Sequence, residues 1–73
     1  MSKVNEAELT LLEYFVFLLE KYNTEGTCSF KFDATVVLLN MYVNEEDIKI
    51  IYNLDTPLKT LMRDMEELVK QFA

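Results

Sequence analysis

Among the side chains that could take part in chemistry, only carboxylates are numerous in this sequence. The 73 residues include 13 Asp and Glu, one cysteine and no histidine. Without histidine there is no ordinary proton shuttle at neutral pH and no imidazole ligand for a metal. Paired carboxylates could still transfer protons, but nothing in their spacing marks a pocket or a nucleophile. We therefore expect a protein that is not an enzyme and that carries no cofactor.

Two smaller features could bind a metal or react as a nucleophile. Glu45, Glu46 and Asp47 form a run of acids, but a calcium loop needs oxygen ligands at alternating positions and a glycine at its sharp turn. Cys28 is the single cysteine, so it cannot build a disulfide or a cysteine-rich zinc site. No histidine is present to activate its thiol. We predict no metal site and a buried or half-buried, unreactive Cys28.

The charge of the chain is strongly negative, with a formal net charge of −6 and an isoelectric point near 4.4. Nucleic-acid phosphates and anionic membranes repel such a chain. Its seven basic residues are scattered and form no cluster of the kind that binds nucleic acid. The polar start does not resemble a secretion signal, and the apolar runs are shorter than the ~20 residues of a membrane span. We expect a cytoplasmic protein.

The spacing of apolar residues predicts a helix near the start of the chain. Asn5 is placed to cap it, and Glu8 follows three residues later, as in a capping box. Apolar residues then recur at helical spacing from Leu9 to Tyr22 and leave a narrow polar face. We expect the helix to end at Gly26, because glycine adopts the left-handed conformation without steric cost.

The middle of the chain gives mixed signals. Residues 27–32 alternate apolar and polar side chains, which predicts a short half-buried strand. Residues 35–43 are nearly all apolar. Their β-branched members favour a strand, whereas the absence of glycine and a capping Asp33 favour a buried helix, which is our prediction. Asn44 is placed to cap a further helix, whose first turn would hold the acids 45–47 at the positive end of the helix dipole.

The last segment predicts an amphipathic helix that starts with Thr56 as N-cap and Pro57 at the first helical position. Its apolar residues repeat with the three- and four-residue spacing of a heptad repeat. The residues of this apolar seam are Leu58, Leu61, Met62, Met65, Leu68 and Phe72. Together the elements predict one mainly α domain over residues 1–73, a bundle of about four helices with a short extended segment near residues 28–32.

The apolar content is the main indication of function. It amounts to 51% of the residues, which is more than a chain of this length hides in one small core. We therefore predict a homodimer that packs through the first and last helices and binds another protein as a regulator or inhibitor. The apolar seam would make the contact, and an acidic rim would suit a basic partner surface. The rim residues are Glu45, Glu46, Asp47, Glu66 and Glu67.

Two alternatives stay open. In the first, the acids of several helices imitate the phosphates of DNA, and the protein inhibits a nucleic-acid-binding enzyme. In the second, residues 34–42 and 45–53 form a degenerate helix-turn-helix that regulates transcription. Its recognition helix would begin with acids and carry Lys49 as its one basic residue, which phosphates disfavour. We predict no direct contact with nucleic acid and none with a membrane.

Overall fold

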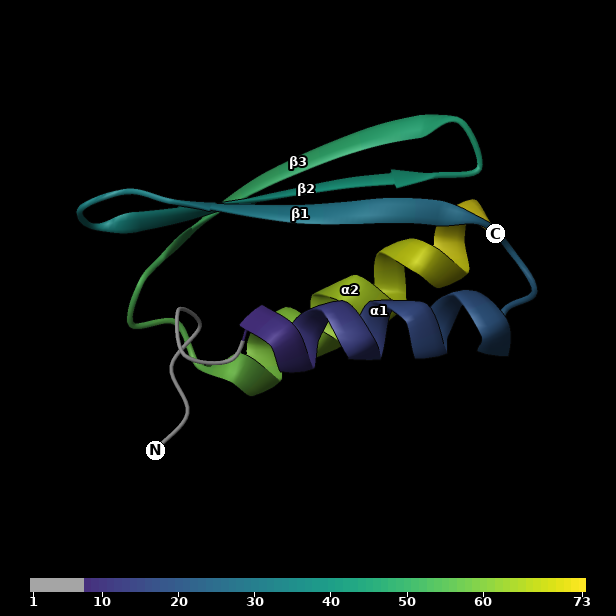
Figure 1. The fold of residues 1–73 in the computed structure, drawn as a ribbon, viewed down its shortest axis with the longest axis horizontal. Helices are drawn as coiled ribbons and strands as arrows, with labels where there is room; N and C mark the ends of the chain where they lie inside the picture. Colours follow the sequence, from purple (N-terminus) through teal and green to yellow (C-terminus); the bar gives the residue numbers. More distant parts are fainter. Residues whose placement is uncertain (1–7) are drawn as a thin grey trace.

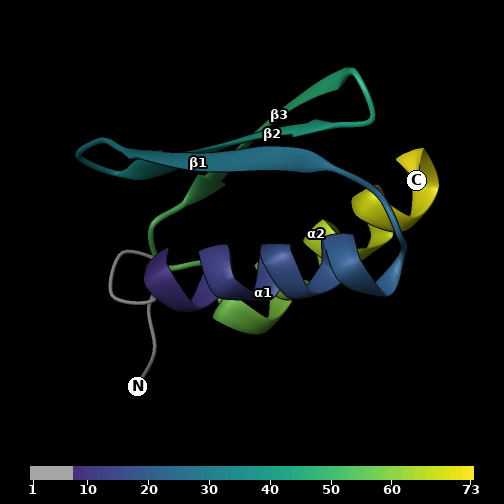
Figure 2. The ribbon, with the colours of Figure 1, turned by 45° about the vertical axis from the view of Figure 1, so that its right-hand side comes forward.

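Residues 8–73 are described by the computed structural model and form an α+β fold (Figure 1). The elements follow in the order α1 (Glu8–Lys21), β1 (Gly26–Phe32), β2 (Val36–Val43), β3 (Glu46–Asn53) and α2 (Leu58–Phe72). The strands form one antiparallel sheet in the order β1-β2-β3. Both helices lie against the same face of this sheet, and no other described element covers its outer face (Figures 1 and 2).

The predicted mainly α bundle of about four helices is wrong. Two helices are present among residues 8–73, and the segments predicted as the two middle helices are the strands β2 and β3. The same finding excludes a helix-turn-helix over residues 34–42 and 45–53. The error has a physical cause. Strand β2 is the central strand and is apolar on both faces, so its sequence shows no alternation that would separate it from a buried helix.

The core lies between the sheet and the helices. It contains four side chains of β2 that point toward the helices, Val37, Leu39, Met41 and Val43. Each helix adds three buried residues: Leu11, Phe15 and Leu18 from α1, and Leu61, Met65 and Val69 from α2. Strands β1 and β3 have half-buried inner residues, because each lies at an edge of the sheet. The central strand therefore supplies most of the sheet's contribution to the core.

A two-residue turn joins β2 to β3. Val43 and Glu46 pair across it, and φ is positive at both turn residues, 50° at Asn44 and 70° at Glu45. Positive φ at both positions is the type I′ geometry, which matches the twist of a β-hairpin. Asparagine tolerates this conformation, whereas glutamate is strained in it. The prediction that Asn44 caps a helix is therefore wrong, because Asn44 occupies a hairpin turn.

The predicted strand over residues 27–32 is confirmed as β1, which begins at Gly26. The prediction that Gly26 ends the first helix is wrong. The helix is terminated instead by Asn23, which has a φ of 53°. Thr24 N donates to Leu19 O at 2.9 Å, as in a Schellman motif. Gly26 is needed for a different reason, because a Cβ there would collide with the backbone carbonyl oxygen of Tyr42 on β2.

The helix ends also differ in detail from the predictions. Helix α2 begins at Leu58 with Pro57 as its N-cap, so the predicted cap Thr56 lies one residue too early. Asn5, the predicted cap of the first helix, lies outside the described residues. Both helices run in the same direction, and their C-terminal ends lie at the end of the molecule that holds the β2–β3 turn (Figure 1). We call this end the hairpin end.

Candidate functional site

The predicted apolar seam of the last helix faces the protein's own sheet. Leu61 and Met65 have no exposed surface and lie inside the core. The other four members are half-buried and pack against that core: Leu58, Met62, Leu68 and Phe72. The centre of the seam is therefore covered within the chain and is not available to a partner.

Glu66, one of the predicted rim residues, joins the two helices. Its Oε2 accepts hydrogen bonds from Tyr22 Oη at 2.7 Å and from Lys21 Nζ at 2.8 Å, and its Oε1 accepts a long one from Tyr14 Oη at 3.4 Å. The hydrogen bonds from Lys21 and Tyr22 hold the pKa of the Glu66 carboxyl below its ordinary value. Glu67, the next residue, is exposed. Glu66 is thus engaged in helix packing.

The other predicted rim residues lie together at the hairpin end. Glu45 is in the β2–β3 turn, and Glu46 and Asp47 begin β3. Asp47 is paired with Tyr42 of β2, so both side chains are on the outer face of the sheet. With its amide nitrogen turned toward β3, Asn40 donates to Asp47 Oδ1 at 2.9 Å. Asp47 is therefore positioned by its neighbouring strand and stays exposed.

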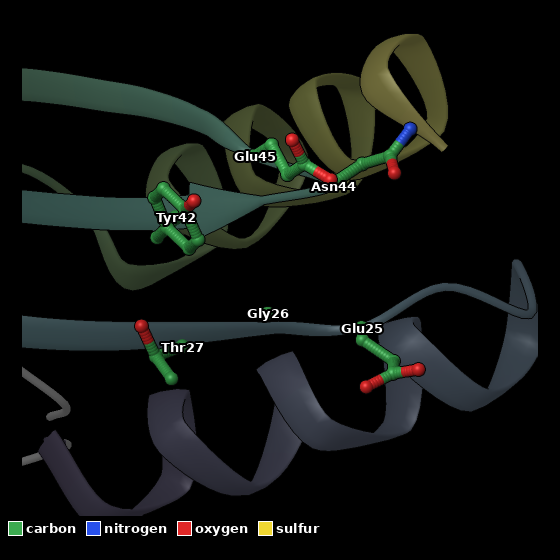
Figure 3. Close-up of a pocket in the computed structure, with 6 residues that line it drawn as sticks. All are labelled: Glu25, Gly26, Thr27, Tyr42, Asn44 and Glu45. Carbon is green, nitrogen blue, oxygen red and sulfur yellow. The ribbon is translucent and has the colours of Figure 1, made fainter.

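A concavity of about 440 Å³ opens at the hairpin end (Figure 3). Figure 3 shows its lining residues on two neighbouring segments, one at the start of β1 and one at the end of β2 and in the turn. We call this concavity, together with the adjacent Asp47, the hairpin-end site. Its lining residues are Glu25, Gly26, Thr27, Tyr42, Asn44 and Glu45.

The backbone of the hairpin-end site is fixed by contacts between distant segments. Asn44 N donates to Glu25 O at 3.1 Å, and the Asn44 side-chain Nδ2 donates to Phe72 O at 3.1 Å. The second bond satisfies a carbonyl at the C-terminal end of α2. Gly26 allows β1 to approach the carbonyl of Tyr42. One asparagine therefore ties the turn both to the start of the sheet and to the last helix.

Backbone strain is concentrated in the same region. The non-glycine residues with positive φ among residues 8–73 are Asn23, Asn44 and Glu45. Asn44 and Glu45 line the concavity, and Asn23 lies beside it, at a smaller hollow that also contacts Asn44. Strained backbone persists where the surrounding structure holds it, and it gathers at functional sites more often than elsewhere. The strained residues therefore mark the hairpin end as a candidate for function.

The chemistry of the hairpin-end site suits a cationic group. The Tyr42 side chain is 47% exposed and lies between Thr27 and Asp47 on the outer face. Glu25 and Glu45 line the same concavity, and no basic residue does so within the described chain. A guanidinium or ammonium group over the face of a tyrosine is attracted by the ring, and nearby carboxylates add charge-assisted hydrogen bonds.

The remaining reactive groups have ordinary structural roles. Cys28 is half-buried, as predicted, and desolvation, with a smaller contribution from Glu8, raises its thiol pKa to about 12. The thiol is therefore protonated at neutral pH and is a poor nucleophile. Residues 8–73 contain no group of three His, Cys, Asp or Glu side chains that could hold a metal ion.

Sequence reasoning missed Glu25 and Thr27, because nothing in the sequence indicates that they lie beside residues 42–45. The Asn44-Glu45 pair was the available signal: an asparagine between two apolar, β-branched runs is typical of a hairpin turn. It also missed the exposed apolar side chains of α1. These are Leu9 at 69%, Val16 at 54% and Phe17 at 53% exposure.

Comparisons of this chain with protein-family models, with curated proteins and with solved structures find no match. A functional assignment therefore depends on the geometry and chemistry of the chain itself. Neither α1 nor α2, the helices within residues 8–73, is long and apolar enough to cross a membrane.

Proposed function

We propose that this protein is a non-catalytic binding module that docks on a basic surface of a protein partner and regulates or inhibits it. The hairpin-end site makes the contact. One observation carries the proposal: exposed Tyr42 lies beside Asp47 and lines a concavity together with Glu25 and Glu45. We assign the protein to the cytoplasm, where a single thiol such as Cys28 stays reduced.

An arginine side chain fits this site better than a lysine side chain. The planar guanidinium stacks on an aromatic ring and donates several hydrogen bonds at once, whereas an ammonium group acts as a compact point charge. At the hairpin-end site the Tyr42 ring would take the stacking contact, and Asp47 or Glu45 would accept the hydrogen bonds. The net charge of −6 would add a longer-range attraction that raises the rate of association.

The imitation of DNA by carboxylates stays an alternative, but the described residues favour it less. Such a surface needs free carboxylates spread along the molecule. Glu66 is bound by Lys21 and Tyr22, and on α1 the acids Glu13 and Glu20 are separated by exposed apolar side chains. Four acids gather at the hairpin end, Glu25, Glu45, Glu46 and Asp47, although Asp47 Oδ2 also lies 3.9 Å from Lys49 Nζ.

A titration with a tetra-arginine peptide, followed by two-dimensional NMR of the protein backbone, tests the proposal. We expect the largest shifts in residues 25–27 and 42–47. The double variant Glu45→Gly, Asp47→Asn should bind the peptide about tenfold more weakly at low salt, because two charge-assisted contacts are lost. Glu45→Gly alone should stabilise the fold by about 1 kcal/mol, because glycine is unstrained at positive φ. Weaker binding would therefore not reflect unfolding.

The matched control removes two charges from the opposite end of the molecule. Asp33 lies in the turn between β1 and β2, and Asp55 lies between β3 and α2. Asp33 Oδ1 accepts a hydrogen bond from Ala34 N, and asparagine keeps an oxygen at that position. The variant Asp33→Asn, Asp55→Asn should bind the peptide as the wild type does. Equal losses in the two double variants, or shifts spread evenly over all acids, would show that only net charge matters and would contradict the proposal.

A further inference from the structure

The outer surfaces of the two helices differ in a way that the hairpin-end site does not explain. The outer surface of a helix here means the side that faces away from the sheet. On α1 this surface carries the exposed apolar residues Leu9, Val16 and Phe17, together with the exposed acids Glu13 and Glu20. The core is complete without these residues, because Leu11, Phe15 and Leu18 fill the opposite side of the helix.

The outer surface of α2 has a net positive charge, because three bases share it with one exposed acid, Glu67. Lys59, Arg63 and Lys70 are exposed and lie four and seven residues apart, which places them on one side of the helix, away from Leu61 and Met65. Among the described residues, the one carboxylate within ion-pair distance of these bases is Asp64, whose Oδ1 lies 3.7 Å from Arg63 Nε. Their long aliphatic stems also offer apolar surface to a neighbour.

We propose that these two surfaces belong to an interface between two copies of this chain, in which the outer surface of α1 from each copy packs on α2 of the other. The acids Glu13 and Glu20 would then face the bases Lys59, Arg63 and Lys70, and the exposed apolar residues of α1 would be buried against the stems of those bases. A second copy of the chain fits this surface because the chain itself carries the complementary charges.

The direction of the helices makes this arrangement symmetric. Helices α1 and α2 lie side by side and run the same way (Figures 1 and 2). A twofold axis parallel to them exchanges their lateral positions, so α1 of each copy lies over α2 of the other and both contacts are identical. The resulting order of layers is sheet, helices, helices, sheet. A perpendicular axis would instead place acid against acid and base against base.

The same symmetry sets the positions of the two hairpin ends. An axis parallel to the helices keeps their direction, so the hairpin-end sites of both copies point the same way. A dimer of this kind would present two cation-binding sites to one partner, and two linked contacts bind more tightly than one. The dimer itself does not depend on the proposed function, because it involves a different surface.

Charge reversal on one helix at a time tests the interface by sedimentation equilibrium across a dilution series. We expect the wild type to be a dimer. The variant Glu13→Lys, Glu20→Lys should place bases against bases, and Lys59→Glu, Lys70→Glu should place acids against acids. Each should weaken dimerisation by about 100-fold or more, because attraction between opposite charges becomes repulsion at both symmetric contacts. All four residues are exposed, so the fold should be retained, as circular dichroism would verify.

Mixing the two variants gives the decisive measurement. In the mixed pair, the basic α1 of one variant would meet the acidic α2 of the other, and the second contact would keep the wild-type pairing of an acidic α1 with a basic α2. The two monomeric variants should therefore form a heterodimer. A single chain with all four reversals should dimerise with itself. The control Lys31→Glu, Lys49→Glu makes the same change in net charge as Lys59→Glu, Lys70→Glu, but on strands β1 and β3, and should leave the dimer intact. A monomeric wild type, or variants that do not pair when mixed, would overturn the interface.

A substitution in the apolar part of the interface completes the test. Val16→Ser should weaken dimerisation by about tenfold, because one side chain per copy no longer buries apolar surface. The double variant Glu45→Gly, Asp47→Asn should leave dimerisation unchanged. Peptide binding and dimerisation are thus tested by different variants. If one proposal fails, the variants and the measurement that test the other are unaffected.

Discussion

Helices α1 and α2 contribute equally to the core but differ in what they present to solvent. Each places three buried residues against the sheet. The outer surface of α1 carries apolar side chains and acids, whereas the outer surface of α2 carries mostly bases. Three buried residues are therefore enough to hold a helix of this length in this fold. Apolar residues beyond that number point to a second contact.

The two helices also differ in how polar side chains hold them. Glu66 of α2 accepts hydrogen bonds from Tyr14 and Lys21 of α1, and Asp64 of α2 accepts one from Tyr52 of β3 at 2.7 Å. Within residues 8–73, every side-chain hydrogen bond of α1 leads to Glu66. Helix α2 is therefore linked to both of its neighbours, whereas α1 is held against the sheet by apolar packing.

The first prediction compares the loss of stability on truncating a residue on the inner surface of α2 with that on truncating one on the outer surface of α1, and it concerns the greatest change in stability. Leu61→Ala removes a side chain with no exposure and should lower the free energy of unfolding by about 3 kcal/mol, because it leaves a cavity in the core. Leu9→Ala, at a residue 69% exposed, should change it by less than about 0.5 kcal/mol. Urea unfolding at low protein concentration measures both. Equal losses would contradict the distinction between the two surfaces.

A smaller effect tests the link between α2 and the sheet. Tyr52→Phe removes the hydrogen bond to Asp64 and should cost about 1 kcal/mol of stability. Tyr42→Phe is the matched control, because the Tyr42 ring lies on the outer face of the sheet and should change stability little. Burial and the hydrogen bond to Asp64 also raise the pKa of the Tyr52 hydroxyl. The pKa values of Tyr14 and Tyr22 are also raised, but by less, so Tyr52→Phe should remove the last tyrosine to titrate in an ultraviolet pH titration.

The smallest expected effect concerns the link between the two helices and depends on pH. The pKa of Glu66 is lower in the folded protein than its ordinary value of 4.5, mainly through the hydrogen bond from Lys21. Its contribution to stability is therefore present above pH 4.5 and is lost as the pH falls through the lower, folded-state pKa. Glu66→Gln should destabilise the protein at neutral pH, and the difference from wild type should shrink in acid.

The matched control for this pH effect is the neighbouring residue. Glu67→Gln changes the same side chain at an exposed position, and its stability should follow the wild type at every pH. Thermal unfolding measured from pH 7 to pH 3 compares the three proteins. A Glu66→Gln variant that keeps the same difference from wild type over the whole range would show that the carboxylate charge does not contribute.

Sequence reasoning succeeded where a segment has one apolar and one polar side. Residues 27–32 alternate with a period of two, and residues 58–72 repeat at helical spacing, so both elements were predicted correctly. It failed for residues 36–53, because a central strand is apolar on both faces and the turn at Asn44-Glu45 lacks the usual glycine. The hairpin-end site could not be predicted as a unit, since it depends on contacts between residues 25, 44 and 72.

The charge of the protein, the absence of histidine chemistry and the residues of the last helix that need burial follow from the sequence alone. Which part of the protein buries those residues follows from the tertiary fold. An apolar spacing shows that a side chain must leave water, but it does not say whether a neighbouring strand or another chain will cover it. Pairing of β1, β2 and β3 supplied the cover for Leu61 and Met65, and it left Val16 and Phe17 exposed.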